Sequence, residues 1–358
     1  MKRCNVCVMP DTRPDTPFVD GVCAPCLIYA KRPEIDWPAR KRQLADLLEH
    51  HRNSSGYDCI VPSSGGKDSH YQVLTLIEMG ARPLVVTAST CHLTKLGRAN
   101  IDNLARYATT IEVTPNRTVR AKLNRLGLEL VGDISWPEHV AIFTTPFKVA
   151  TDFGIPMIFY GENPQNQYGG PPGTEEALEM TRRWRSEFGG FLGLRPSDMV
   201  GKLGITARDM EDYEMPATWA RLPLDEIRAY FLGQYLPWCS HRNAEVAIGV
   251  GMHAPFAAPT LANWWEWENL DNAQTGLHDW FMYLKYGYGR GCAQISMDIR
   301  AGRIDRTTAL GWVIDHDGLY PRIYAEVTIE SVLERIGMSV GELMKLAAKY
   351  RVHGELPI

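Results

Sequence analysis

A short segment at residues 63–69, Ser-Ser-Gly-Gly-Lys-Asp-Ser, has the residue types of a phosphate-binding loop. Two adjacent glycines let backbone N–H groups turn toward an anion, and the start of the helix expected after them adds its dipole. The hydroxyls of Ser64 and Ser69 and the ammonium of Lys67 are further donors for phosphate oxygens. Because a bare phosphate would repel the carboxylate of Asp68, this residue predicts a bridging Mg²⁺ ion.

The loop differs from a Walker A motif, which would need glycine at position 61 and Ser or Thr after the lysine, where this chain has Val61 and Asp68. The order S-G-G-K-D-S instead resembles the PP-loop of ATP pyrophosphatases, which cleave ATP between the α- and β-phosphates. The alternative is an ordinary glycine-rich turn, which would explain the two glycines but not the serines, the lysine and the aspartate beside them. We predict ATP and Mg²⁺ as cofactors and Lys67 and Asp68 as catalytic residues. The predicted cofactor-binding residues are Ser64, Gly65, Gly66, Lys67, Asp68 and Ser69.

Two Cys-x2-Cys pairs near the start of the chain predict a metal site. Cys4 and Cys7 are followed after fifteen residues by Cys23 and Cys26, a spacing typical of zinc knuckles. Four thiolates fill a tetrahedral coordination sphere, so we predict a structural Zn²⁺. An iron–sulfur cluster and two disulfides remain alternatives. The other cysteines are scattered singly: Cys59, Cys91, Cys239 and Cys292.

The bulk composition is that of an ordinary globular protein. The chain has 358 residues, of which 45% are hydrophobic and 22% are charged, and a formal net charge of −4. Its apolar runs are much shorter than the roughly 20 residues needed to cross a bilayer, and its first residues do not resemble a signal peptide. We therefore expect a cytoplasmic protein without a membrane partner. The negative net charge argues against a dedicated nucleic-acid-binding protein.

Short apolar segments alternate with amphipathic ones from residue 57 to residue 160, which predicts a parallel sheet covered by helices. The expected strands include residues 59–61, 84–86, 111–113 and 155–159. The expected helices include residues 37–52, 119–126, 139–153, 174–188 and 328–336, a helix carrying Ile101, Leu104, Ala105 and Ala108, and a final helix with a capping box at Ser339–Glu342. Ligands bind beyond the carboxyl ends of strands in such a sheet.

The predicted fold is α/β, with a parallel-sheet PP-loop ATP pyrophosphatase (HUP-like) domain, an N-terminal zinc knuckle and a C-terminal helical region. We divide the chain into a zinc knuckle at residues 1–33, the ATP-binding domain at residues 34–260 and a mainly helical region at residues 261–358.

With these motifs placed, nearly the whole chain resembles the N-acetyl sugar amidotransferase family of bacterial surface-glycan pathways. The segments that carry the resemblance are residues 4–14, CNVCVMPDTRP; 21–26, GVCAPC; 64–69, SGGKDS; 161–164, GENP; 168–170, YGG; 285–290, KYGYGR; and 298–302, DIRAG.

The resemblance implies a reaction that turns the acetamido group of a nucleotide sugar into an acetamidino group. The amide oxygen would attack the α-phosphorus of ATP, and ammonia would then displace AMP from the adenylylated imidate. The family pattern also implies that a separate glutaminase subunit, with a cyclase-like barrel protein, supplies the ammonia. The predicted substrate-binding residues are Glu162, Asn163, Tyr168, Lys285, Arg290 and Arg300.

Two other functions remain open. A PP-loop enzyme that thiolates tRNA would use the same adenylation chemistry, but it would need sulfur-handling cysteines and a basic RNA-binding surface. A scaffold with an inactive loop would not need both Lys67 and Asp68. His70 is ambiguous, since it could approach the phosphates or support the loop from inside the fold. We expect most tryptophans to lie in the core, and we do not expect the C-terminal helices to bind DNA.

Overall fold

The computed structural model describes residues 1–13, 16–31, 34–52, 56–164, 177–216, 227–354 and 356. Its centre is a five-stranded sheet in the order β5-β4-β3-β6-β7. The strands are β3 (Cys59–Pro62), β4 (Pro83–Ala88), β5 (Thr110–Val113), β6 (Met157–Tyr160) and β7 (Arg228–Phe231). All neighbouring strands run parallel, which confirms the predicted α/β class. The edge strand β7 was not predicted.

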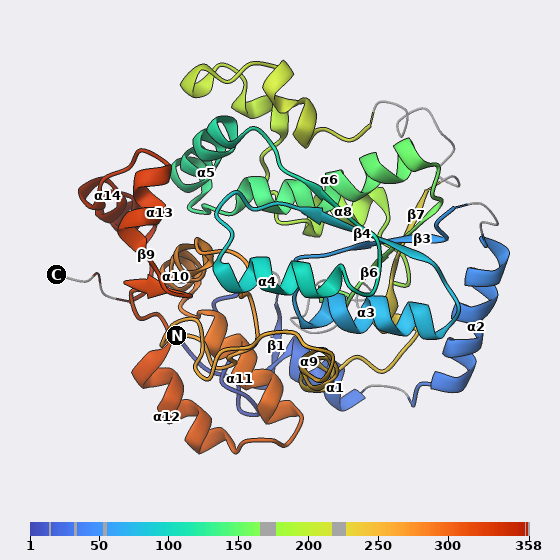
Figure 1. Cartoon of the computed structure of the whole chain (residues 1–358). Coiled ribbons are helices and arrows are strands. Elements are labelled where there is room, and N and C mark those ends of the chain that lie inside the picture. The colour runs from blue at the N-terminus through green and yellow to red at the C-terminus, as the bar shows by residue number, and fades with distance from the viewer. Residues whose placement is uncertain are drawn as a thin grey trace.

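Helices cover both faces of this sheet (Figure 1). One face packs on α2 (Trp37–His50), α3 (Lys67–Glu78) and α4 (Lys95–Leu104). The other packs on α6 (Trp136–Phe153) and α8 (Arg182–Phe188). Burial on both faces explains why the inner strands are continuous apolar runs without alternation. The adjoining helix α5 (Arg117–Val131) packs on α6.

Two predicted helices are shorter in the structure than the sequence suggested. The helix predicted at residues 174–188 begins at Arg182, and residues 174–176 lie outside the described residues. The chain just before it is extended and pairs with the sheet edge, since the N–H of Met180 donates to the carbonyl of Ala229 in β7. Likewise α4 ends at Leu104, so Ala108 lies beyond the helix that was predicted to include it.

The C-terminal part is mainly helical. Its helices are α9 (Ser240–Gly249), α10 (Thr275–Tyr286), α11 (Arg290–Arg300), α12 (Arg306–His316), α13 (Ile329–Arg335) and α14 (Val340–Tyr350). A short hairpin, β8 (Ile323–Tyr324) and β9 (Val327–Thr328), precedes α13. The predicted capping box is present: the N–H of Ser339 donates to Glu342 at 2.8 Å, and the N–H of Glu342 donates to the Ser339 hydroxyl at 3.2 Å. Helix α9 packs against α3.

The N-terminal segment forms the hairpin of β1 (Phe18–Val19) and β2 (Val22–Cys23), followed by α1 (Ala24–Lys31). Short 3₁₀ helices complete the described elements at Pro196–Met199, Lys202–Gly204, Arg208–Tyr213 and Leu232–Gln234. Among the described helices, none combines the length and the apolar character needed to cross a membrane.

Candidate functional site

The strongest candidate site lies where the strand order of the sheet reverses. Strands β3 and β6 are neighbours at the centre, and the connections that follow them leave in opposite directions along the sheet. Such a point opens a crevice at the carboxyl ends of the strands. A cavity of about 160 Å³ lies there. It is lined by Ser64, Gly65, Gly66, Lys67, Asp68, Ser69, Gly97, Asn100, Glu162, Trp267, Glu268, Asn269, Leu270, Asp271 and Arg290.

The glycines of the loop have distinct structural roles. Gly65 has φ +78°, and a Cβ atom there would lie 2.8 Å from both the backbone nitrogen and Cγ1 of Ile101 on α4. Its N–H donates to the Ser63 hydroxyl at 3.0 Å, which tightens the turn. Gly66 is the N-cap of α3, and no side chain caps this helix. The first N–H groups of α3 therefore remain available to an anion in the cavity.

Gly65→Ala is expected to be strongly disruptive, because alanine would combine a left-handed backbone with a clash against α4. We expect unfolding free energy to fall by about 2–4 kcal/mol. If the loop binds ATP as the sequence predicts, calorimetry should find that this binding is lost. Gly80→Ala is the matched control, since Gly80 has φ +80° but its nearest contact would be 3.9 Å away, at Arg52 Nη2. Equal effects of the two substitutions would show that packing of the loop on α4 is unimportant.

Lys67 is buried and is held by two carboxylates. Its Nζ lies 2.6 Å from Oδ2 of Asp68 and 3.2 Å from Oε1 of Glu268. Burial alone would lower the pKa of Lys67, but Asp68 and Glu268 outweigh this effect and hold that pKa above the usual lysine value. The other oxygen of Asp68 accepts a hydrogen bond from the Asn243 amide at 2.8 Å. The lysine thus carries a positive charge at the cavity wall, oriented by groups from distant segments.

Glu268 was missed by the sequence interpretation. Its second oxygen accepts a hydrogen bond from Gln294 at 2.7 Å. Although burial opposes ionisation, Lys67 and Arg290 hold the pKa of Glu268 below its usual value, so it is a carboxylate. The only signal in the sequence was that residues 266–271 contain three acidic residues. Burial raises the pKa of Asp271, at the end of this segment, to about 6.

Of the predicted substrate-binding residues, the structure brings Glu162 and Arg290 to the cavity. Burial, reinforced by Asp68 and opposed by Lys67, raises the pKa of Glu162 to about 7. Arg290 donates from Nε and Nη2 to the carboxylate of Asp279, with distances of 2.9–3.1 Å. Asn163 is buried after β6 but does not line the cavity.

The other predicted substrate residues lie elsewhere. Lys285 donates to the carbonyl of Val131 at 3.2 Å, near the end of α5. Arg300 lines a separate cavity of about 190 Å³ together with Trp238, Trp265 and other residues. Lys285, Arg290 and Arg300 therefore do not line one common cavity. Tyr168 lies outside the described residues.

His70 supports the loop from inside the fold. Its Nδ1 lies 3.0 Å from the carbonyl oxygen of Gly66, and its Nε2 lies 3.0 Å from the amide nitrogen of Asn103. The side chain is fully buried, and this burial lowers the pKa of His70. A neutral imidazole that bridges the loop to α4 fits a structural role in positioning Gly66.

The four N-terminal cysteines form one buried cluster whose ligand atoms all lie within 4.8 Å of one another. The N–H groups of Val6, Cys7 and Cys23 donate to Sγ of Cys4 at 3.3–3.5 Å. Hydrogen bonding with Cys23 lowers the pKa of the Cys7 thiol to about 7. Four converging sulfurs with backbone N–H donors fit a tetrahedral ion such as Zn²⁺, and the site leaves no open position for substrate.

The cysteine cluster packs on the C-terminal helices. Its core is continuous with Cys292 and Ile295 of α11 and with Ala309 and Val313 of α12. Arg306, the first residue of α12, donates to the carbonyls of Cys4 and Cys7 at 2.9–3.1 Å. The cluster therefore supports helix α11, whose first residue, Arg290, reaches the candidate site.

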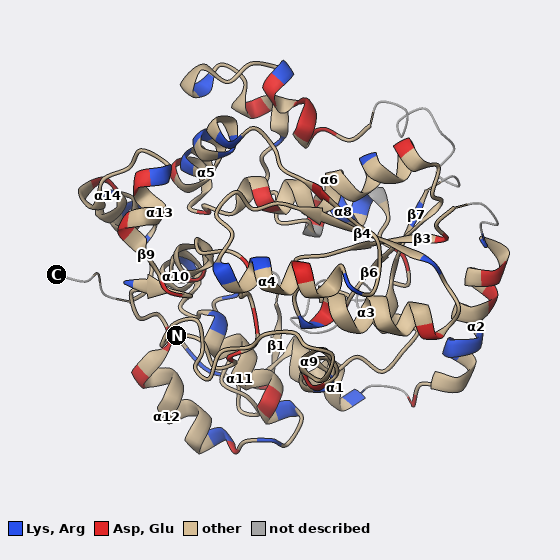
Figure 2. Ribbon diagram, in the orientation of Figure 1, with Lys and Arg blue, Asp and Glu red and all other residues tan. Residues whose placement is uncertain are grey.

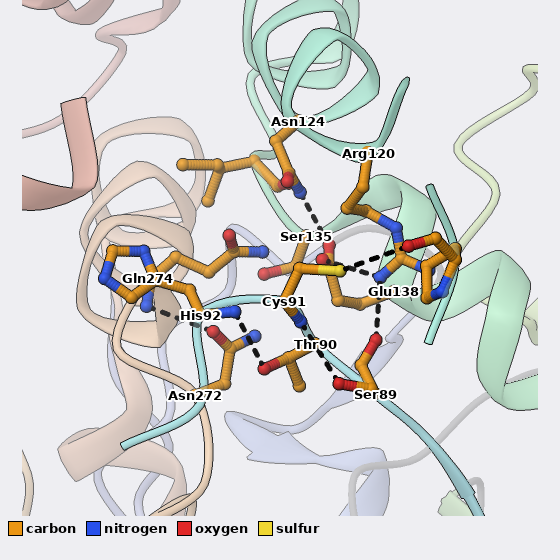
Figure 3. Close-up of polar contacts among 12 residues, drawn as sticks. Ser89, Thr90, Cys91, His92, Arg120, Asn124, Ser135, Glu138, Asn272 and Gln274 are labelled. Atoms are coloured by element: carbon orange, nitrogen blue, oxygen red, sulfur yellow. Dashed lines mark hydrogen bonds and ion pairs between the residues drawn. The ribbon is translucent and has the colours of Figure 1, made fainter. Parts of the chain in front are cut away.

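A second buried polar region lies beside the loop that follows β4 (Figure 3). Arg120 and Glu138 form an ion pair at 2.9 Å, and Asn124 donates to the same carboxylate at 2.8 Å. Cys91, in this loop, has φ +60° and an Sγ atom 3.9 Å from the carbonyl oxygen of Pro115. Burial raises the pKa of the Cys91 thiol, so it is not an activated nucleophile.

Comparison with known protein families finds a match in the C-terminal part of the chain. Residues 259–355 match the family model described as LPS biosynthesis protein WbpG-like, C-terminal domain. No curated protein matches the chain significantly. The matched segment contributes Glu268, Asp271 and Arg290 to the candidate site. Over these residues, the chain is similar to proteins of lipopolysaccharide biosynthesis.

Proposed function

We propose that this protein is an ATP-dependent, AMP-forming amidotransferase that converts an acetamido group of a nucleotide sugar into an acetamidino group during surface-glycan biosynthesis. The observation that carries the proposal is the cavity at the strand reversal, where the uncapped start of α3, the turn at Gly65 and the charged Lys67 face a common space. This arrangement suits the pyrophosphate portion of ATP.

The carboxylates around the cavity support the use of Mg²⁺. Asp68, Glu162 and Glu268 all line it, and they would repel the phosphates of ATP without a cation between them. Carboxylates and phosphates are the oxygen ligands that Mg²⁺ prefers, and Asp68 and Glu162 are the residues that would hold it. A bound Mg²⁺ would neutralise charge on the leaving pyrophosphate. The indole N–H of Trp267 has no hydrogen-bond partner among the described residues and is a further donor for a ligand.

The proposed reaction begins with attack of the amide oxygen on the α-phosphorus. The bond between the α-phosphorus and its bridging oxygen breaks, and pyrophosphate leaves. Ammonia then adds to the imidate carbon, and AMP leaves with the former amide oxygen. Lys67 stabilises the charge that develops on the phosphates. We propose that a separate glutaminase, with a cyclase-like barrel protein, supplies the ammonia, since at neutral pH free ammonia is mostly protonated.

The tRNA-thiolating alternative is less well supported. Burial raises the pKa of the thiols of Cys59 and Cys292, as it does for Cys91, which disfavours sulfur transfer by these residues. Figure 2 shows acidic as well as basic residues on α2, α12 and α14. This pattern differs from the continuous basic surface expected for binding RNA.

The function is tested by incubating the purified chain with ATP, Mg²⁺ and ammonium at raised pH, together with a panel of acetamido nucleotide sugars. Mass spectrometry should find a product in which one oxygen is replaced by NH, accompanied by equal amounts of AMP and pyrophosphate. Glutamine should replace ammonium only when a glutaminase partner is added. Product formation from tRNA and a sulfur donor would instead support the alternative function.

Glu162 should give the stability of the Mg²⁺-free protein a measurable pH dependence. Its pKa is about 7 in the folded protein but 4.5 as the ordinary reference value. The folded state therefore holds an extra proton between these values, so its contribution to stability is complete below pH 4.5 and is lost as pH rises through 7. Between pH 4.5 and pH 7, the unfolding free energy of Glu162→Gln should therefore fall by roughly 1–3 kcal/mol less than that of wild type. Denaturant unfolding at a series of pH values measures this difference.

The exposed residue Glu245 offers the matched control, and Glu245→Gln should follow the wild-type pH profile. Asp271, which is half-buried, and Asp317, which is buried, also contribute to the wild-type profile because desolvation raises the pKa of each to about 6. The informative quantity is therefore the difference between wild type and Glu162→Gln. A constant difference from pH 4.5 to pH 7 would contradict the raised pKa of Glu162.

A further inference from the structure

A cluster of two histidines and one aspartate lies outside the candidate site. Asp133 sits in the connection between α5 and α6, His139 lies in the first turn of α6, and His278 lies on α10. Their potential ligand atoms all lie within 4.8 Å of one another. None of the proposed catalytic steps uses these three residues. They also join a helix of the sheet layer to one of the C-terminal helices.

The two imidazoles approach the two oxygens of one carboxylate. His278 Nδ1 lies 2.7 Å from Oδ1 of Asp133, and His139 Nδ1 lies 3.5 Å from Oδ2. The carboxylate is fixed by the N–H of Ser135, which donates to Oδ1 at 2.8 Å. Ligand atoms of a tetrahedral ion with bonds near 2.1 Å lie about 3.4 Å apart. Small side-chain rotations would therefore bring all three residues into coordination.

The His139 side chain lacks a partner that a bound cation would supply. The Nδ1 atom of His139 is buried and makes no hydrogen bond in the described part of the chain, although it faces a carboxylate oxygen. A cation between them would satisfy both atoms.

Two basic residues, Arg290 and Lys285, lie close enough to repel a cation bound by the cluster. The positive charge of each is weakened by its surroundings. Arg290 interacts with both histidines, but it forms a bidentate pair with Asp279. Burial lowers the pKa of Lys285, the other basic neighbour of Asp133. Both histidines remain partly open to solvent, with side-chain exposures of 27% for His139 and 20% for His278. An ion could therefore exchange with the solvent.

We propose that Asp133, His139 and His278 bind a divalent transition-metal ion, in addition to the ion predicted for the cysteine cluster. Two imidazoles and one carboxylate suit Zn²⁺, Fe²⁺, Co²⁺ and related ions better than Mg²⁺. Three protein ligands leave a coordination position for water. By binding ligands from both segments, the ion would cross-link α10 to the connection between α5 and α6 and to the first turn of α6. This site is independent of the proposed amidotransferase reaction, so it can be tested whether or not that reaction occurs.

The test is metal analysis of the full-length chain after equilibration with Zn²⁺ and removal of unbound metal. Wild type should hold about two equivalents, whereas His278→Ala and His139→Ala should each hold about one, retained by the cysteines. His50→Ala, at an exposed histidine on α2, is the control and should hold as much metal as wild type. About one equivalent in wild type, or no loss in either cluster variant, would overturn the proposal.

A second measurement covers the case in which a variant folds poorly. Co²⁺ bound by nitrogen and oxygen ligands lacks the thiolate charge-transfer absorption of Co²⁺ bound by four cysteines. Wild type should therefore take up Co²⁺ in two spectroscopically distinct steps. His139→Gln, at the more exposed histidine, should lose only the step without charge-transfer absorption. A single thiolate-type step in wild type would rule the second site out.

Discussion

Lys67→Ala is expected to lower the rate of AMP formation by roughly 10²–10³-fold, which is the usual loss when one preorganised charge is removed from an active site. Lys67 is buried and held charged by Asp68 and Glu268, so in the proposed reaction no reorganisation is needed when charge develops on the leaving pyrophosphate. The rate is measured as AMP and pyrophosphate released under saturating ATP and acceptor.

Lys95→Ala is the matched control, because Lys95 is an exposed lysine at the start of α4 and should leave the rate unchanged. Removing Lys67 also leaves Glu268 without its cationic partner, so unfolding must be measured in parallel. A fully folded Lys67→Ala protein with wild-type turnover would contradict the assigned role of the lysine.

Cys23→Ser is expected to have the largest effect on stability. Four thiolates bind Zn²⁺ much more tightly than three, and a small segment without its own core depends on the ion for order. We expect the metal of the cysteine cluster to be lost and unfolding free energy to fall by more than about 4 kcal/mol. Because the cluster shares a core with α11 and α12, hydrogen exchange should accelerate in these helices too.

The control is Cys239→Ser, at a half-buried cysteine outside the cluster, which should retain the metal. Elemental analysis distinguishes the possible ions. Iron in place of zinc would contradict the predicted zinc knuckle, and retention of the full metal content by Cys23→Ser would show that the cysteine is not a ligand.

The parts of the site that local sequence could predict are those built from contiguous residues. Residues 63–69 supply both the turn and the helix start, and the Cys-x2-Cys spacing by itself places pairs of sulfurs together. Glu268 could not be found in this way, since it lies 201 residues from Lys67 and meets it only through the packing of the C-terminal part on the sheet. The same holds for Asn243, which reaches Asp68 from α9.

The basic residues of the C-terminal part show a second limit of prediction from sequence: it does not tell which of them share a cavity. Lys285, Arg290 and Arg300 have equivalent chemistry in the sequence, but Arg290 and Arg300 are the first and last residues of α11. At about 1.5 Å per residue, the helix separates them by roughly 15 Å, too far for one cavity of this size. Strand β7 was missed for a related reason: its four residues, Arg-Ala-Tyr-Phe, become a strand by pairing with β6 and have little local signal.

The most direct test of the proposed chemistry follows the oxygen of the acetamido group. An acceptor nucleotide sugar labelled with a heavy oxygen isotope in its amide carbonyl is incubated with the protein, ATP, Mg²⁺ and ammonium, and the released nucleotide is analysed by mass spectrometry. Attack of the amide oxygen on the α-phosphorus predicts that the label appears in AMP and is absent from the amidine product. Release of ADP, or AMP without the label, would contradict activation of the amide by adenylation.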